Sequence, residues 1–377
     1  MTSASNRRPL VVMFLTERPF GHDWARAARR VADVVTVAVV KDPVAARRRW
    51  ETVHGPAAVD HWVPVFKVRP GGIFSRVNQR ITAGRVEARL RRIESERGSI
   101  SLLHGHFYAR SSFLPHVRRS FGIPFVVTEH STRLTRESAA HKPLSRTGLR
   151  IAADVFGTAG RVVAVSEYLR SCIAALGLPG DVEVIGNPID TAVFRPPEQR
   201  PEEDLVVSIG RLESDKDPDL VVDAFALARA QIPSLRLEMI GDGPERRRIA
   251  DRIDRQGLSG VVSISPYLPR EAVAERLRSA RVFALGSRVE TFCVAAAEAI
   301  SCGVPVVMPR IGPMPELVDE SNGILLGDRD PAVMAESLLR AARGVFDANA
   351  MAAGIATRFG DEHVAAELAR LYSAVGR

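Results

Sequence analysis

Two cations in the second half of the sequence have the spacing of an anion-binding turn. Arg211 and Lys216 stand in "GRLESDKDPDL", directly after the apolar run "VVSIG". A backbone turn at Gly210, followed by two cations just ahead of a helix, forms a cradle for a phosphate or another anion. The alternative is that both cations lie in an ordinary solvated surface turn.

Two carboxylates follow in "SRVETFCVAAAEAISCGVPVV" (287–307). Glu290 and Glu298 would lie roughly 80° apart around a single helix, because each residue turns the chain by about 100°. They face one ligand only if Glu290 lies in a loop and Glu298 in the helix that follows. The sequence predicts this arrangement, since "TF" forms helices poorly, "VAAAEAIS" forms them well, and Gly303 ends the helix.

The start of this helix offers a second set of anion-binding groups. Unpaired amides near Phe292, Cys293 and Val294 would attract an anion by about 0.3–1 kcal/mol. Glu298 can accept hydrogen bonds from a neutral diol such as ribose, and Glu290 from a second hydroxylated ring. A solvated glutamate on a helix flank is the alternative, and the surrounding Ala and Val residues disfavour it.

Apolar, β-branched runs alternate with helix-like stretches along the whole chain, in two series. The first series occupies 9–16, 34–40, 101–107, 124–130, 161–169 and 181–188, and the second 205–212, 235–243, 261–268, 282–287, 304–310 and 323–327. Continuous apolar strands alternating with helices predict parallel sheets covered on both faces. The fold class is therefore α/β, with two Rossmann-like, doubly wound domains.

The segment "RPPEQRPEED" (195–204) is predicted to link the two domains, because it holds three prolines and six charged residues. We expect an N-terminal acceptor-side domain over 1–196 and a donor-binding domain over 197–357. Residues 358–377 are expected to form a helix that crosses back to the first domain. Ligands of open parallel sheets bind at the carboxyl ends of the strands, which predicts a site in the cleft between the domains.

Composition and charge favour a globular protein without a membrane span, and they show an uneven distribution of charge. The chain has 377 residues, is 46% hydrophobic and carries a net charge of +8, with +14 in residues 1–200 and −6 in the remainder. This asymmetry indicates an anionic partner for the first half, or a genome that favours arginine.

No run reaches the ~18 apolar residues of a membrane span. The apolar stretch near the N-terminus reads as a strand and not as a signal peptide. Three cysteines without metal spacing favour free thiols in the cytoplasm.

The arginine-rich segment 73–97 has two interpretations. Its apolar residues recur at helical spacing among seven arginines, so it could lie on an anionic membrane as a peripheral helix. We prefer a helix packed on the first sheet with a solvated basic face. No nucleic-acid partner is expected.

Four segments together resemble the retaining glycosyltransferases of family 4, which have the GT-B fold. They are "GRLESDK", "IGDGPERRRIADRI", "ETFCVAAAEAISCGVPVV" and "GNPIDTAVFRP", and the likeness runs from about residue 101 to the C-terminus. The resemblance implies transfer of a sugar from a UDP- or GDP-sugar to a hydroxylated acceptor, without an essential metal or cofactor.

The resemblance also implies roles for particular residues of the second domain. Arg211 and Lys216 would hold the donor diphosphate, Glu290 the donor sugar and Glu298 the nucleotide ribose. The amides that follow Glu290 would cap the distal phosphate.

Four positions depend on the resemblance more than on local pattern. His130 in "PFVVTEHS" would line the reaction centre, so His130, Arg211, Lys216 and Glu290 are the expected catalytic residues. Gly21, the only glycine of "TERPFGHDW", would contact donor or acceptor. Cys293 stands where the family has glycine but still supplies an amide. Leu268 is the expected contact to the base.

Three Asp-x-Asp patterns could suggest a bound metal: Asp215/Asp217, Asp217/Asp219 and Asp328/Asp330. Because Asp-Pro marks a helix start, we interpret them as helix caps. His104 and His106 alternate on a strand end, and no third ligand follows nearby, so we predict no metal site there.

Two other functions fit the same fold. A nucleotide-sugar 2-epimerase is disfavoured by the combination of "GRLESDK" and "ETF". A catalytically inert nucleotide-sugar-binding protein is disfavoured because both cations and both carboxylates are present.

Overall fold

The computed structural model describes residues 8–16, 21–54, 59–65, 75–141, 143–199 and 204–376. The chain divides into two compact units, Met1–Pro188 with Asp361–Arg377, and Ile189–Gly360. The linker expected at 195–204 thus begins inside the second unit, and its residues 200–203 lie outside the described residues.

Unit 1 contains a seven-stranded sheet in the order β3-β2-β1-β4-β5-β6-β7, in which every pair is parallel. The strands are β1 (Leu10–Leu15), β2 (Asp33–Val40), β3 (His61–Pro64), β4 (Leu102–His106), β5 (Phe125–Glu129), β6 (Arg161–Ala164) and β7 (Val182–Val184). Its helices are α1 (His22–Ala28), α2 (Pro43–His54), α3 (Ser75–Arg97), α4 (Leu114–Phe121), α5 (Arg136–His141), α6 (Arg146–Thr158), α7 (Glu167–Ala175) and α15 (Asp361–Val375).

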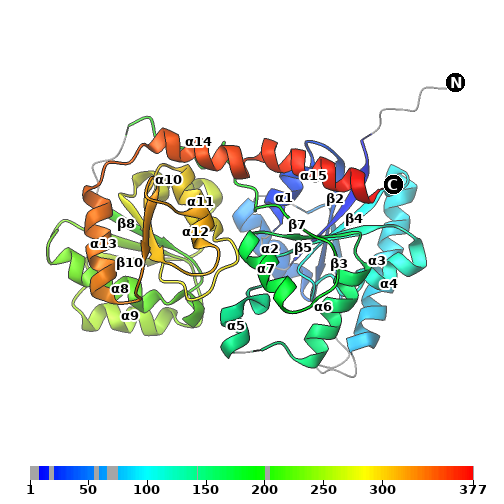
Figure 1. Cartoon of the computed structure of the whole chain (residues 1–377), viewed down its shortest axis with the longest axis horizontal. Coiled ribbons are helices and arrows are strands. Elements are labelled where there is room, and N and C mark those ends of the chain that lie inside the picture. Colours follow the sequence, from blue (N-terminus) through cyan, green and yellow to red (C-terminus); the bar gives the residue numbers. More distant parts are fainter. Residues whose placement is uncertain are drawn as a thin grey trace. The chain divides into compact units, whose positions relative to one another are not determined.

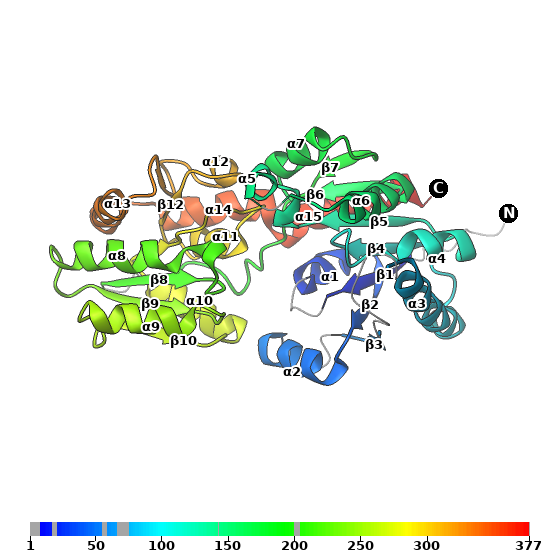
Figure 2. The same cartoon turned by 90° about the horizontal axis from the view of Figure 1, so that it is seen from below.

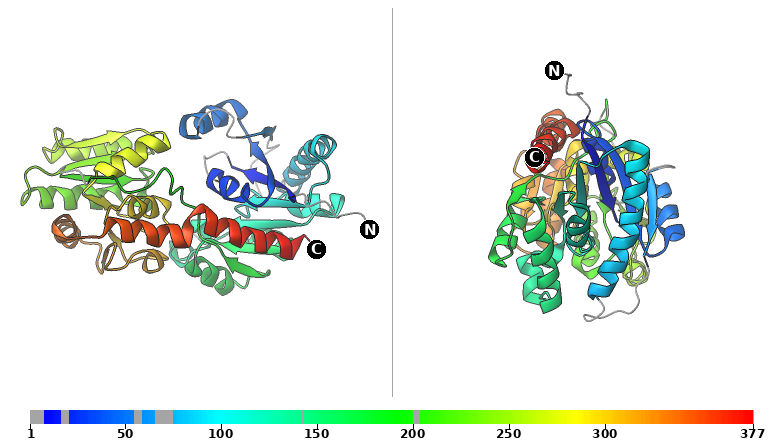
Figure 3. Two further views of the ribbon diagram at one scale, coloured as in Figure 1. Left: turned by 90° about the horizontal axis from the view of Figure 1, so that it is seen from above. Right: turned by 90° about the vertical axis from the view of Figure 1, so that its right-hand side faces the viewer.

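Two pairs of helices in unit 1 lie side by side. α15, the red helix at the end of the chain, packs along α1 (Figure 3), and Arg26 of α1 forms a bidentate contact with Asp361 at 2.6 and 2.8 Å. α3 packs against α4 (Figure 2) and buries Val86, Leu90 and Ile93 completely. The basic helix therefore has a packed apolar face. Phe74, one of its expected apolar residues, lies outside the described residues.

Unit 2 contains a six-stranded parallel sheet in the order β10-β9-β8-β11-β12-β13. The strands are β8 (Leu205–Ile209), β9 (Arg236–Ile240), β10 (Val262–Ser265), β11 (Val282–Ala284), β12 (Val306–Pro309) and β13 (Gly323–Leu326). Its helices are α8 (Pro218–Arg229), α9 (Arg246–Arg255), α10 (Arg270–Ser279), α11 (Val294–Ser301), α12 (Met314–Leu317), α13 (Pro331–Arg343) and α14 (Ala348–Phe359).

Helices cover both faces of the second sheet (Figure 1). α8 and α13 lie side by side, and their buried residues Phe225, Leu338 and Met334 join the strands in one core. α11 and α14 pack together on the other face (Figure 1). Because both faces are covered, the strands bury most of their side chains, which explains why continuous apolar runs predicted them.

Each of the twelve apolar runs contains a strand, and the α/β prediction with two doubly wound domains is confirmed. The sequence did not predict β3, whose four residues include one buried side chain, Val63. A short edge strand with so little burial carries no apolar pattern. Within the described ranges, we find no helix that is both long and apolar enough to span a bilayer.

Candidate functional site

Lys216 and Glu290 form an ion pair in unit 2, although 74 positions separate them in the sequence. Lys216 ends a short 3-10 helix (Ser214–Lys216) after β8, and Glu290 lies in the loop between β11 and α11. Both loops follow the carboxyl ends of adjacent strands, so the sheet brings them together.

Both members of this pair are shielded from solvent, and Glu290 favours the charged form of Lys216. Glu290 is 6% exposed and also accepts a hydrogen bond from Ser287 Oγ at 2.7 Å. Burial opposes the charge of Lys216, but the neighbouring Glu290 carboxylate raises the pKa of the ammonium group above its usual value. The site therefore presents a cation next to a buried carboxylate.

Arg211 follows β8 in the same loop as Lys216. A Cβ atom added at the preceding Gly210 would lie 4.0 Å from Lys216 Cγ, so the backbone of the turn packs against the lysine. The Arg211 guanidinium pairs with Glu213, which raises the pKa of Arg211. Its Nε atom is buried and has no hydrogen-bond partner among the described residues. Arg211 thus retains an unused donor.

Helix α11 begins at Val294, so Glu290 lies in the loop and Glu298 in the helix, as the residue types predict. Cys293 occupies the N-cap position with a left-handed backbone, φ 68°, and makes no side-chain cap. Within the described residues, the amides of Phe292, Cys293 and Val294 donate to no backbone carbonyl. The N-terminus of α11 therefore offers N–H groups beside the Lys216–Glu290 pair.

The side chains around this helix start are uncharged or half-buried. Burial raises the pKa of the Cys293 thiol, so it stays neutral. Phe292 is buried and packs edge-to-face on Phe359, with ring centroids 4.9 Å apart. Glu298 is half-buried in the second turn.

Asp217, which follows Lys216 in the sequence, forms an ion-paired cluster with Arg288 and Arg329. Asp217 accepts from Arg288 at 2.6 Å and from Arg329 at 2.5 Å. Arg329 also donates to the carbonyls of Gly286 and Ser287. These contacts join three loops of unit 2: the loop after β8, the loop between β11 and α11, and the loop between β13 and α13. The sequence reading missed both arginines, because neither has a local pattern that marks it.

The capping interpretation holds for one of the Asp-x-Asp patterns and is wrong for another. Asp330 caps α13 by accepting from the amides of Ala332 and Val333. Asp217 occupies the N-cap position of α8 with a left-handed backbone (φ 42°), but its side chain does not cap the helix. Its carboxylate binds Arg288 and Arg329 instead. Among the described residues, no three His, Cys, Asp or Glu side chains are grouped as a metal site requires.

Replacing Asp217 with alanine is expected to lower the free energy of unfolding of unit 2 by about 2–3 kcal/mol. The change leaves Arg329 without its carboxylate, and it forces alanine into a left-handed backbone. Asp217→Gly removes the same carboxylate without the backbone strain, so it should be about 1 kcal/mol more stable than Asp217→Ala. Urea unfolding of both variants tests this. Equal stabilities would contradict the contribution of the backbone.

Leu268, the expected contact to the base, lies in the loop after β10, and its role stays a prediction. Leu268 is half-buried in this loop. Its neighbour Tyr267 is 47% exposed, and its hydroxyl donates to the Asp242 carbonyl at 3.5 Å.

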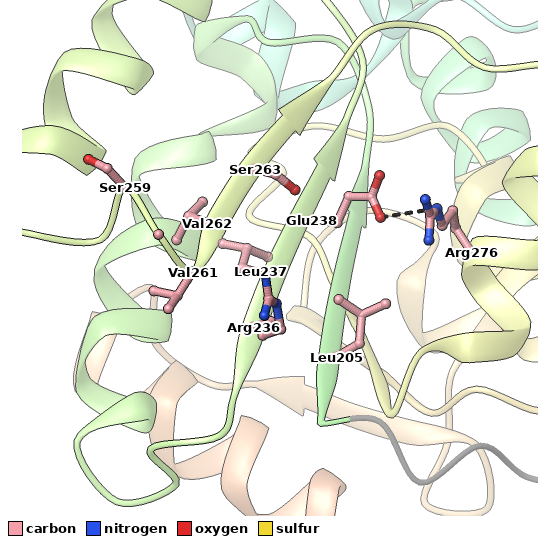
Figure 4. Close-up of a pocket in the computed structure, with 10 residues that line it drawn as sticks. Leu205, Arg236, Leu237, Glu238, Ser259, Val261, Val262, Ser263 and Arg276 are labelled. Atoms are coloured by element: carbon pink, nitrogen blue, oxygen red, sulfur yellow. Dashed lines mark ion pairs between the residues drawn. The ribbon is translucent and has the colours of Figure 1, made fainter.

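A pocket of about 380 Å³ in unit 2 lies away from these residues (Figure 4). It is lined by the first residues of β8 and β9, Leu205 and Arg236, so it is at the amino ends of the strands. Arg276 points toward Glu238 at one side of it, with an ion pair of 3.4 Å. The candidate donor residues follow the opposite, carboxyl ends of the strands.

In unit 1, His130 belongs to a buried cluster at the ends of β4 and β5. His130 Nε2 lies 3.0 Å from His106 Nδ1, and the His106 ring stacks on His104 with centroids 4.9 Å apart. Gly21 begins α1 with φ 99°, and a Cβ atom added there would lie 3.6 Å from His106 Nε2. The structure therefore joins Gly21 and His130 through His106, to which the sequence reading gave no role.

Both units of the chain match models of known glycosyltransferase families. Residues 190–355 match the family model described as "Glycosyl transferases group 1", and residues 21–193 match "Glycosyltransferase Family 4". The chain is 32% identical over 165 residues to one component of the phosphatidylinositol N-acetylglucosaminyltransferase of Arabidopsis thaliana, which is 43% of this chain and 37% of that relative. It is 27% identical to D-inositol 3-phosphate glycosyltransferase of Frankia alni, over 70% of each chain.

Solved structures share the whole fold. HepE from Anabaena in complex with UDP and glucose has a TM-score of 0.76 at 17% identity, covering 98% of this chain and 100% of that one. Sucrose-phosphate synthase from Thermosynechococcus elongatus has a TM-score of 0.75 at 19% identity, covering 97% and 98%. These likenesses confirm the GT-B fold.

Proposed function

We propose that this chain, which belongs to glycosyltransferase family 4, transfers a sugar from a nucleotide-diphosphate sugar to a hydroxyl group of an acceptor. One observation supports this most directly. Unit 2 pairs the Lys216 ammonium with the buried Glu290 carboxylate, beside the turn of Arg211 and the N-terminus of α11. A diphosphate that carries a sugar has the anionic and hydroxylated parts that these groups bind.

In this proposal each residue of unit 2 binds one part of the donor. Arg211 and Lys216 neutralise the diphosphate, and the amides at the start of α11 cap its distal phosphate. Glu290 accepts hydrogen bonds from the sugar hydroxyls, and Glu298 from the ribose. Because the cations supply the positive charge, no metal is required in this scheme.

The proposed reaction retains the configuration of the sugar carbon. The bond between that carbon and the diphosphate oxygen breaks, and the diphosphate leaves with the electron pair. The acceptor oxygen attacks from the same face, and its proton passes to the departing phosphate oxygen. The enzyme contributes mainly by stabilising the negative charge that develops on the diphosphate.

UDP-glucose and an inositol phosphate are the first substrates to test. HepE binds UDP and UDP-glucose in its solved structures. Several relatives are named for D-inositol 3-phosphate. The net charge of +14 in residues 1–200 also suits an acceptor that carries phosphate.

Release of nucleoside diphosphate distinguishes the candidate functions. The full chain is incubated with UDP-glucose, with and without D-inositol 3-phosphate, and UDP is counted against glycosylated product. A transferase releases UDP in proportion to the acceptor consumed. Release of UDP without acceptor and without product would favour an epimerase. No release with any nucleotide sugar, despite binding, would leave only an inert binding protein.

A thermal-shift panel of UDP-, GDP- and ADP-glucose should identify the base. A ligand present at a hundred times its dissociation constant stabilises the folded state by about 2.7 kcal/mol. For a domain of this size the expected rise in Tm is about 5–10 °C. The matching free sugar, glucose, serves as the control and should not shift Tm. Equal shifts with all three nucleotides would contradict selection of one base.

Peripheral contact with an anionic membrane through α3 is a second part of the proposal. Val77 and Ile81 are 45% and 36% exposed on this arginine-rich helix. We expect the chain to sediment with vesicles that contain phosphatidylserine, and to be released by salt. Binding should fall in a variant with Val77→Asp and Ile81→Asp. If the fraction of protein that sediments with the vesicles changed neither with salt nor with these substitutions, contact through α3 would be excluded.

A further inference from the structure

Arg329 contacts both loops of unit 2 that carry the ion-paired donor residues. It lies in a third loop, between β13 and α13. Its Nη1 atom donates to the Ser287 carbonyl at 2.5 Å, and its Nη2 atom donates to the Gly286 carbonyl at 2.7 Å and to Asp217 Oδ2 at 2.5 Å. One guanidinium group thus binds two loops that follow different strands, β8 and β11.

Short paths lead from these contacts to the Lys216–Glu290 pair. Asp217 directly follows Lys216 in the chain. Ser287 Oγ donates to Glu290 Oε1 at 2.7 Å, and the same oxygen pairs with Lys216 Nζ. Asp217, Ser287 and Glu290 are all buried. A displacement of either loop would therefore change the geometry of the ion pair.

The carbonyls of Gly286 and Ser287 use Arg329 as a donor. Both residues are buried, and no backbone amide among the described residues donates to either carbonyl. Buried carbonyls are nearly always hydrogen-bonded. Loss of the guanidinium would therefore favour a different position of this segment, in which the carbonyls regain a donor.

Arg288 provides a comparison within the same cluster, because it binds the same carboxylate. Its Nη2 atom lies 2.6 Å from Asp217 Oδ2, but its side chain is 59% exposed. In the part of the chain that the structure describes, its guanidinium donates to neither loop carbonyl. Two arginines thus neutralise Asp217, whereas only Arg329 of the two also binds the backbone ahead of Glu290.

We propose that Arg329 is a positioning residue for sugar transfer. Its guanidinium fixes the loops of Lys216 and Glu290 in the geometry that the departing diphosphate requires. The proposal rests on the proposed function, since it assigns a role in that reaction, and Arg329 acts through the ion pair. A planar guanidinium suits this role, because its donors diverge in fixed directions that one ammonium group does not reproduce.

Replacing Arg329 with alanine is expected to lower kcat by about 10- to 100-fold and to change KM for UDP-glucose by less than about threefold. A misplacement of reacting groups by about 1 Å has an effect of this size on the rate. KM changes less, because Arg211 and the N-terminus of α11 still bind the donor. Arg340→Ala is the matched control, since Arg340 is exposed on α13, and it should have the wild-type kcat. A wild-type kcat in Arg329→Ala would overturn the proposal.

Two further variants separate positioning from neutralisation of Asp217. Arg329→Lys keeps the charge but loses the planar group, so it should have nearly the wild-type Tm and a kcat at least about fivefold lower. Arg288→Met removes an exposed partner of Asp217 and should lower kcat by less than about threefold. The proposal is wrong if Arg329→Lys has the wild-type kcat, or if Arg288→Met is as slow as Arg329→Ala.

Added guanidinium tests the same contacts in Arg329→Ala. The wild-type side chain is 27% exposed, so a small ion can reach the space that alanine leaves. Guanidinium chloride at about 10–50 mM, far below denaturing concentrations, should raise kcat at least about threefold. Methylammonium chloride at the same concentration should not. Equal recovery with both ions would contradict the proposal, as would a rise in Tm with guanidinium that leaves kcat unchanged.

Hydrogen exchange of the full chain tests the proposal without turnover. In Arg329→Ala, amides of 213–218 and 286–293 should exchange at least about threefold faster than in the wild type, and amides of α9 should be unchanged. Exchange at the wild-type rate in both loops would overturn the proposal. If the wild-type chain turns over no nucleotide sugar, the proposed transfer fails, and the exchange rates still decide whether Arg329 fixes the two loops.

Discussion

Replacing Lys216 with methionine is expected to slow sugar transfer by about 30- to 150-fold. A cation that stabilises the departing diphosphate by about 2–3 kcal/mol in the transition state gives an effect of this size. Methionine keeps most of the aliphatic stem of Lys216 and removes the charge. Initial rates of UDP release from UDP-glucose, with saturating acceptor, measure the loss. Arg211→Ala should reduce the rate for the same reason.

The ion pair with Glu290 complicates this result, because Lys216→Met also leaves a buried carboxylate without its cation. The single variant should therefore be less stable than the wild type. The double variant Lys216→Met/Glu290→Gln removes both charges, so it should recover much of the stability. It should not recover activity, because the charge facing the diphosphate is still absent. This cycle separates the structural role of Lys216 from its role toward the ligand.

Arg247→Met is the matched control for loss of a cation. Arg247 is exposed on α9 of the same unit and lies outside the candidate donor residues. We expect its activity to be that of the wild type. If the double variant of Lys216 and Glu290 transferred sugar at the wild-type rate, the proposed binding of the diphosphate by Lys216 would be wrong.

Unit 1 is expected to lose about 2–4 kcal/mol of stability when the pH is lowered from 7 to 5. Burial lowers the pKa of His104, His106 and His130 in the folded chain, whereas histidine in an unfolded chain titrates near 6.5. The unfolded state therefore binds more protons below pH 6.5. The stability that the neutral histidines contribute is present above 6.5 and is lost as the pH falls toward the folded values.

Glu129 opposes part of this loss. Burial raises the pKa of its carboxyl to about 7, although the amides of Tyr108, His130 and Ser131 bind the carboxylate form. The folded state therefore takes up a proton here between about pH 7 and 4.5, which adds stability as the pH falls. Three histidines against one glutamate leave a net loss on acidification.

Urea unfolding of the full chain at pH 7, 6 and 5 and constant ionic strength measures this dependence, with far-UV dichroism as the signal. His104→Gln should reduce the slope by about half, because three histidines less the opposing Glu129 leave about two net protons, and the variant removes one of them. Glu129→Gln should steepen it, since the opposing group is removed. Stability that is flat between pH 7 and 5 would contradict the burial of neutral histidines.

The sequence by itself determined the fold class and the positions of most strands. Both sheets are buried on both faces, so their strands must be continuously apolar, and such runs are visible without knowledge of their neighbours. Local residue types also placed Glu290 in a loop and Glu298 in helix α11. These properties depend on the residue and its near neighbours alone.

Tertiary structure alone decided which side chains meet. Parallel crossovers carry distant loops to one edge of a sheet, so Lys216 meets Glu290, and Asp217 meets Arg329 across 112 positions. The packing of α15 on unit 1 likewise brings Tyr372 to His104 across 268 positions. No local pattern predicts such pairings, because the residues that flank one partner in the sequence do not depend on the identity of the other partner.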